Sequence, residues 1–200
     1  MDERTAAVDL AERVAQIARG LEIETVLIGA YALAVHHFVR GSSDIDLASS
    51  VNVQELYLLR RAATDAGYQT DWTSPEEGDP LGDVLRIWER EDEDGIPIDP
   101  VEVVNYLNPY TPQRTPAAQA IRNAIPLAEK PDLKYPRLSD LIALKLYSGG
   151  DDDASDVVKL IAANPDADLE EIRSVCKAYG FDRIDELIEK GRTQKPRRKG

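Results

Sequence analysis

Two aspartates, Asp44 and Asp46, are the residues whose type and spacing point most directly to chemistry. Side chains of a β-strand alternate between its two faces, so the carboxylates of an Asp-x-Asp pair on a strand share one face. Their like charges repel, and the apolar neighbours Ile45 and Leu47 do not relieve that repulsion. Mg²⁺ is commonly held by one or two carboxylates together with substrate phosphates. The pair therefore predicts a metal-dependent site that handles a nucleoside triphosphate.

The residues that precede the pair suit the binding of a phosphate group. The short, β-branched segment 23–28 predicts a buried strand, and Gly29-Ala30 follow it as a turn of small residues that lets the backbone approach a bound group. A short helix over 31–38 would begin at this turn, and the N-terminus of a helix is a common phosphate site. A second strand over 44–48 then carries the two aspartates.

The rest of the chain predicts strands and helices that alternate and then give way to helices alone. This order is typical of an α/β (α+β) protein with a mixed sheet flanked by helices. We expect an α/β domain over 1–130, a helical C-terminal subdomain over 131–192 and a basic flexible tail over 193–200. The further helices are expected at 4–19, 53–66, 117–124, 138–148, 152–163, 168–179 and 182–191, and the further strands at 68–72, 83–90, 96–105 and 125–127.

The composition and charge of the chain make several classes of protein less probable. The 200 residues carry a formal net charge of −13, which disfavours non-specific binding to nucleic acid. The single cysteine, Cys176, excludes an intrachain disulfide. No apolar run approaches the ~20 residues that span a bilayer, and the charged N-terminus has no apolar signal core. We expect a cytoplasmic protein without a membrane partner.

The segment 28–47 resembles the nucleotidyltransferase superfamily, which includes DNA polymerase beta, the kanamycin-type antibiotic nucleotidyltransferases and the AbiEii-like toxins. The signature of that family is a Gly-Gly or Gly-Ser pair, a helix and then Asp-x-Asp, and the AbiEii-like subset adds an Arg and a Ser or Thr just before the aspartates. Arg40 and Ser43 stand at these two positions. The chain departs from the pattern at Ala30, so the hydroxyl that binds phosphate would have to come from Ser42 or Ser43.

The resemblance also implies a third carboxylate on a neighbouring strand. Asp99 is the preferred match, and Glu102 is the alternative. The two differ in strand parity, so only one of them shares the face of the aspartate pair unless a bulge intervenes. Pro100 follows Asp99 and cannot donate to a strand ladder.

A second resemblance to the same family covers 138–161. Lys145 and Asp156 stand where the relatives carry a polar Lys and Asp, which implies that Lys145 contacts the phosphates of the substrate. The alternative is that Lys145 forms a salt bridge on the surface of a helix.

Together these resemblances imply a Mg²⁺-dependent nucleotidyltransferase. It would transfer a nucleoside monophosphate from a nucleoside triphosphate to an RNA, protein or small-molecule acceptor, and a toxin–antitoxin role would add an antitoxin or toxin partner. Asp44, Asp46 and the third carboxylate would hold the metal, while Gly29 admits the phosphates and Arg40 neutralises developing charge. The alternative is a non-catalytic binding or regulatory protein that keeps this fold.

Overall fold

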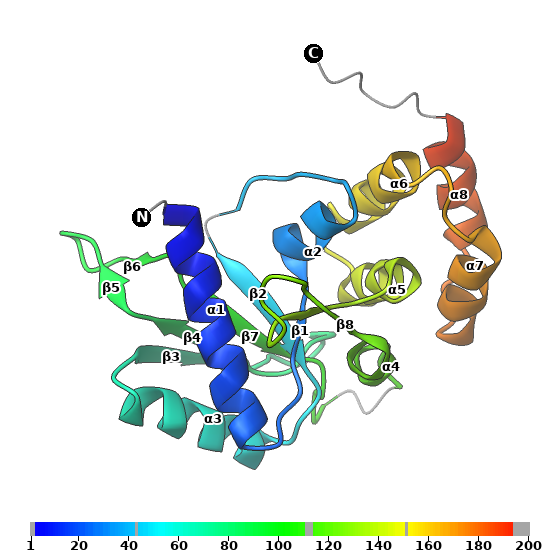
Figure 1. Cartoon of the computed structure of the whole chain (residues 1–200). Helices are drawn as coiled ribbons and strands as arrows, with labels where there is room; N and C mark the ends of the chain where they lie inside the picture. The colour runs from blue at the N-terminus through cyan, green and yellow to red at the C-terminus, as the bar shows by residue number, and fades with distance from the viewer. Residues whose placement is uncertain (1–2, 43, 111–113, 151, 194–200) are drawn as a thin grey trace.

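A mixed five-stranded sheet in the order β1-β2-β7-β4-β3 forms the centre of the molecule (Figure 1). The computed structural model describes residues 3–42, 44–110, 114–150 and 152–193, with side chains from residue 6 onward. The strands of the sheet are β1 (Val26–Leu27), β2 (Ile45–Ser49), β3 (Gln69–Thr73), β4 (Val84–Trp88) and β7 (Val101–Asn105).

The strand register decides which side chains share a face. β2 runs parallel to β7, and Asp46 pairs with Glu102 across this junction. β4 runs antiparallel to β7, and Arg86 pairs with Glu102 from the other side. β1 and β3 complete the sheet as antiparallel partners of β2 and β4. Polar residues of adjacent strands therefore meet in one row across the sheet.

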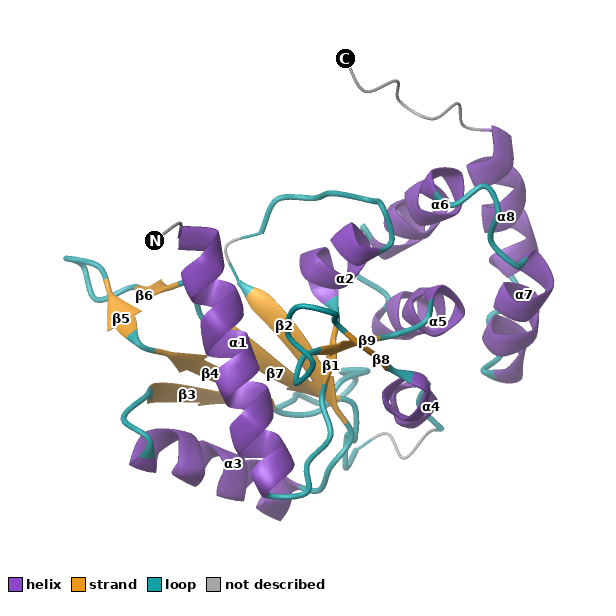
Figure 2. Ribbon diagram, viewed as in Figure 1, coloured by secondary structure: helices purple, strands orange, loops and turns teal. Residues whose placement is uncertain are grey.

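Two helices, α1 (Glu3–Gly20) and α3 (Val53–Asp65), cover one face of the sheet (Figure 2). Their apolar faces pack on the alternate strand residues that point away from the polar row, such as Leu47 and Val103. Asn52 caps α3 by accepting a hydrogen bond from the backbone N–H of Glu55, whose side chain accepts one from the backbone N–H of Asn52.

The opposite face is only partly covered. A second apolar cluster, which includes Ala48 and Val104, lies near the carboxyl ends of β2 and β7 under α4 (Ala117–Asn123) and α5 (Leu138–Ser148). The short helix α2 (Gly29–Val35) packs beside β2. The carboxylates of the polar row lie on this second face, closer to the amino end of β2.

Helices continue from α5 to the end of the described chain. α6 (Asp153–Ala163) and α7 (Leu169–Ala178) pack against α5, and α8 (Ile184–Thr193) packs against both of them, on the side of the molecule away from β3 (Figure 1). Two small ribbons, β5–β6 (Arg90–Glu91 and Pro97–Ile98) and β8–β9 (Ile125–Pro126 and Lys134–Tyr135), lie outside the central sheet. No described helix has the length and apolar character needed to cross a bilayer.

The structure confirms the predicted fold class, a mixed sheet flanked by helices. Two predicted elements differ from the structure. The strand expected over 96–105 divides into β6 and β7, because Asp99 has a φ of 50° and Pro100 lacks a backbone N–H. The segment 131–136, expected as a linker, contains β9. The division into domains stays a prediction, and the tail over 194–200 lies outside the described residues.

Candidate metal and nucleotide site

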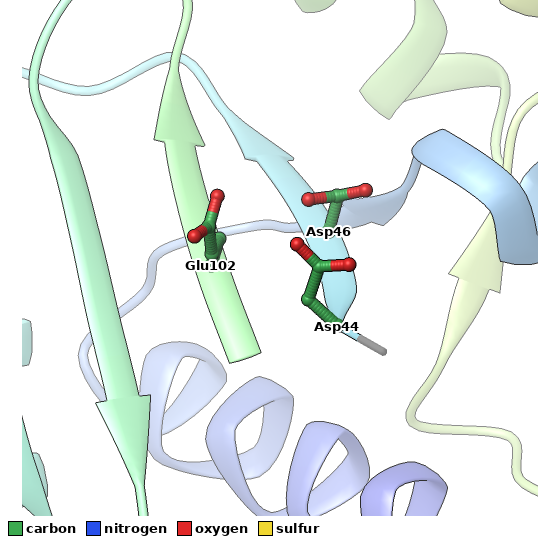
Figure 3. Close-up of side chains that lie close together, drawn as sticks. All are labelled: Asp44, Asp46 and Glu102. Carbon is green, nitrogen blue, oxygen red and sulfur yellow. The ribbon is translucent and has the colours of Figure 1, made fainter. Parts of the chain in front are cut away.

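Three carboxylates meet on the partly covered face of the sheet (Figure 3). One oxygen each of Asp44, Asp46 and Glu102 lies within 4.8 Å of the others. Asp44 directly precedes β2 and Asp46 lies within it, so their spacing of two residues sends both to the same face. Glu102 joins them because it lies directly beside Asp46 in the parallel register of β2 and β7.

The structure does not bring Asp99, the preferred third carboxylate, together with this pair. The role of Asp99 or Glu102 as a metal ligand stays a prediction. Asp99 lies in the turn between β6 and β7, in the left-handed region of backbone conformation, and it is not a member of the group. Glu102, the alternative, is the carboxylate beside Asp44 and Asp46. One carboxylate oxygen of Asp99, Oδ2, is buried without a hydrogen-bond partner among the described residues.

Asp46 is the most perturbed member of the group. Burial, followed by the charges of Asp44 and then Glu102, raises the pKa of Asp46 to about 6, while Arg40 and Lys145 act in the opposite direction. Carboxylates that crowd and repel one another in this way are the oxygen donors that a hard divalent cation prefers. The donor set therefore fits Mg²⁺, and a bound cation would offset both the burial of the Asp46 charge and its repulsion by Asp44 and Glu102.

The close contact between Gly29 and the Asp46 carboxylate requires a glycine at position 29. A Cβ atom built on Gly29 would lie 1.8 Å from Oδ2 of Asp46, and the φ of Gly29 is 57°. The backbone N–H of Ile28 donates to the backbone carbonyl of Asp46 over 2.9 Å, which holds the start of α2 against β2. In the structure, the space that glycine leaves is thus taken by Asp46. Ala30, the departure from the family pattern, is buried next to it.

Two cations, Arg40 and Lys145, act to lower the pKa of Asp46 and share one carboxylate, Asp156. Nη1 of Arg40 donates to Oδ2 of Asp156 over 2.9 Å, and Nζ of Lys145 lies 3.1 Å from the same oxygen. Lys145 also pairs with Asp153 over 2.7 Å. Asp156 is 1% exposed, whereas the Arg40 side chain is 42% exposed and accessible to a ligand. The salt bridge considered for Lys145 is therefore present, but in a buried network and not on an open helix surface.

A small cavity lies between α2 and the loop that leads to β2. Its volume is about 170 Å³, and its lining includes Ala30, Arg40 and Ser42. The hydroxyl of Ser42 donates to Oδ1 of Asp44. Ser43 lies outside the described residues. The predicted nucleotide-binding residues Ala30, Arg40 and Ser42 are therefore neighbours in space, and Ser42 connects them to the carboxylates.

Sequence reasoning missed one residue of the site, Arg86. Its Nε donates to Oε1 of Glu102 over 2.8 Å, and this hydrogen bond is the main cause of the raised pKa of Arg86. The alternation of residues 83–90 indicated a strand with Arg86 on its polar face. Which residue Arg86 faces depends on the pairing of β4 with β7, and no local pattern fixed that pairing.

Comparisons with known proteins give a match in structure only. No family model matches the chain, and no curated protein matches its sequence. An antigenic nucleotidyltransferase-like protein from Paracoccidioides brasiliensis is similar in structure, with a TM-score of 0.51 and 14% identity over 94% of this chain and 93% of that one. ANT(2'')-Ia, solved in complex with adenylyl-2''-tobramycin, gives a TM-score of 0.44 and 15% identity over 94% of this chain and 98% of that one.

At this level of identity the similarity concerns the fold and not the activity. The similarity to the Paracoccidioides protein extends over nearly the whole of both chains, so it includes the central sheet and the C-terminal helices. The protein therefore has the fold of the nucleotidyltransferase superfamily.

Proposed function

We propose that the protein is a Mg²⁺-dependent nucleotidyltransferase that transfers a nucleoside monophosphate from a nucleoside triphosphate to an acceptor hydroxyl. The observation that supports this most strongly is the group of Asp44, Asp46 and Glu102, three carboxylates within 4.8 Å of one another on a nucleotidyltransferase fold. Like charges held this close repel one another, and a divalent cation would offset that repulsion.

Asp44, Asp46 and Glu102 would hold Mg²⁺. Bound there, the metal would supply Lewis-acid stabilisation of the charge that develops on the phosphate group and would favour the ionised form of the attacking hydroxyl. Glu102 would help to take the proton of the attacking hydroxyl, because it stands beside the aspartate pair.

The positive charges of Arg40 and Lys145 suit the rest of the triphosphate. In the reaction the acceptor oxygen forms a bond to the α-phosphorus, the bond from that phosphorus to the bridging oxygen breaks, and pyrophosphate leaves with the electron pair. Arg40 is half-exposed beside the 170 Å³ cavity and would donate hydrogen bonds to the phosphates that leave. Lys145, fixed by Asp153 and Asp156, would add a second positive charge from behind Arg40.

The charge of the protein bears on the class of acceptor. The net charge of −13 favours a protein or a small molecule over RNA, because a polyanion would be repelled from most of the surface. A toxin–antitoxin role, with a toxin or antitoxin partner, belongs to the same proposal, as does activity in the cytoplasm. Transfer of a labelled nucleoside monophosphate to proteins, RNA and small molecules, each offered separately, would identify the class.

Calorimetry tests the nucleotide site before the acceptor is known. We expect the wild-type protein to bind a non-hydrolysable nucleoside triphosphate analogue only when Mg²⁺ is present. The variant Asp46→Asn should weaken this binding at least about tenfold, because it removes one charged metal ligand. Asp65→Asn on the exposed end of α3 removes the same charge far from the site and should have no effect. A wild-type protein that shows no metal-dependent nucleotide binding would exclude the proposed function.

A further inference from the structure

Arg86 holds the third carboxylate of the site from the side opposite the aspartates. It lies on β4 directly across from Glu102 on β7, while Asp46 on β2 lies on the other side of Glu102. The guanidinium donates from both Nε and Nη2, and both bonds go to one oxygen of Glu102, Oε1. The second oxygen, Oε2, therefore receives no hydrogen bond from Arg86.

The contact between Arg86 and Glu102 opposes the electrostatic repulsion among the three carboxylates. Asp44 and Asp46 repel Glu102, and a glutamate side chain has enough rotatable bonds to swing away from them. Two donors in the fixed plane of a guanidinium hold Oε1 of Glu102 from two directions, whereas a single ammonium group on a flexible stem fixes its position less well. The Glu102 side chain is 17% exposed, so hydrogen bonds to solvent contribute little to its position.

Arg86 is itself placed by carboxylates on both sides. Asp71 on β3 lies across from Arg86 in the antiparallel register, so a row of Asp71, Arg86, Glu102 and Asp46 crosses four strands. The Arg86 side chain is 46% exposed, so its ion pair with Glu102 is well solvated and adds little to the stability of the fold. The ion pair between Arg86 and Glu102 is therefore expected to affect the geometry of the metal site more than the stability of the fold.

We propose that Arg86 is a positioning residue, which fixes Glu102 so that one carboxylate oxygen stays directed at the metal site formed with Asp44 and Asp46. The inference rests on the proposed function, because it assigns Arg86 a role only if these carboxylates bind a divalent cation. Arg86 touches neither the metal nor the substrate in this role. It acts on both through Glu102.

Titration of the metal-free protein with Mn²⁺ alone, followed by calorimetry, tests the role of Arg86 without any need for substrate. Arg86→Lys keeps the charge but loses the planar pair of donors, and we expect it to weaken Mn²⁺ binding about tenfold. Arg86→Gln removes a positive charge next to the metal. Electrostatics alone would make this variant bind Mn²⁺ more tightly, whereas loss of positioning makes it bind more weakly, and the weaker binding is expected.

Arg61→Gln is the matched control, because it removes an exposed arginine from α3 and should leave Mn²⁺ binding unchanged. The melting temperatures of all three variants in the absence of metal should lie near that of the wild type, which separates positioning from a purely structural role. Arg86→Lys binding Mn²⁺ as tightly as the wild type, or Arg86→Gln binding it more tightly, would overturn the role of Arg86 alone. A wild-type protein that binds no Mn²⁺ would overturn the proposed function and this inference together.

Discussion

At the scale of single residues, Asp46 connects the electrostatics of the site to the stability of the protein. Its pKa is about 6 in the folded protein and 3.8 in an unperturbed side chain. The folded state therefore binds more protons than the unfolded state between these two values. By linkage, the stability of the metal-free protein falls as the pH rises through this range and then stays level above it.

Removal of this charge should therefore stabilise the protein while it weakens metal binding. We expect Asp46→Asn to raise the free energy of unfolding by about 1 to 3 kcal/mol at pH 8 in a metal chelator, because a shift of one pKa unit corresponds to about 1.4 kcal/mol. The gain should shrink as the pH falls from 6 towards 4 and vanish well below the unfolded pKa of 3.8, where the wild-type carboxyl is protonated in both states. Denaturant unfolding at a series of pH values measures it. A gain of the same size at pH 4 and pH 8 would argue against the raised pKa.

Single residues also show which parts of the site can be predicted from the sequence. Asp44 and Asp46 could be assigned to one face from their spacing alone, because strand periodicity is a local property. The choice between Asp99 and Glu102 could not be made in this way, since it depends on the residue at which β7 begins. The positive φ of Asp99 and the missing N–H of Pro100 decide that point, and Glu102 consequently faces the aspartates.

At the scale of elements, the contact between the start of α2 and β2 defines the site. Most helices and strands were predictable from apolar periodicity and from glycine or proline boundaries, α3 among them. Their pairing was not, because strand order in a mixed sheet is set by contacts between residues far apart in the chain. For that reason, no pattern in the sequence indicated that Arg86 belongs to the site.

Gly29→Ala tests the contact between α2 and β2. A Cβ at Gly29 collides with the Asp46 carboxylate and demands a left-handed conformation, which costs about 1 kcal/mol or more in an L-residue. We expect lower stability and loss of Mg²⁺-dependent nucleotide binding, measured by denaturant unfolding and calorimetry. Gly41→Ala serves as the control, because a Cβ there meets nothing within 4 Å. Nucleotide binding by Gly29→Ala at the wild-type level would contradict the required contact with Asp46.

At the scale of the whole molecule, a buried carboxylate joins the C-terminal helices to the segment that carries the cavity. Asp156 on α6 binds Arg40, which lies 116 positions earlier in the chain, and it also binds Lys145 on α5. The family resemblance singled out all three residues separately. It did not show that one carboxylate holds both cations, because that requires α5 and α6 to be packed beside the loop after α2.

Asp156→Asn should weaken this connection. The variant leaves Arg40 and Lys145 without their buried counter-charge, and loss of one partner from a buried ion pair costs up to several kcal/mol. Since Arg40 is half-exposed and Lys145 keeps Asp153, we expect a loss of about 2 kcal/mol in the free energy of unfolding. Asp166→Asn, in the exposed turn between α6 and α7, should be near neutral. Equal stability of the two variants would show that Asp156 does not join these parts of the molecule.

The identity of the third carboxylate is the central structural claim, and Mn²⁺ titration of two matched variants tests it most directly. Glu102→Gln and Asp99→Asn each remove one carboxylate charge from the same stretch of chain. We expect the wild-type protein and Asp99→Asn to bind Mn²⁺ equally well, and Glu102→Gln to bind it at least about tenfold more weakly, because only Glu102 lies with Asp44 and Asp46. Unchanged binding by Glu102→Gln together with weaker binding by Asp99→Asn would contradict the site described by the structure.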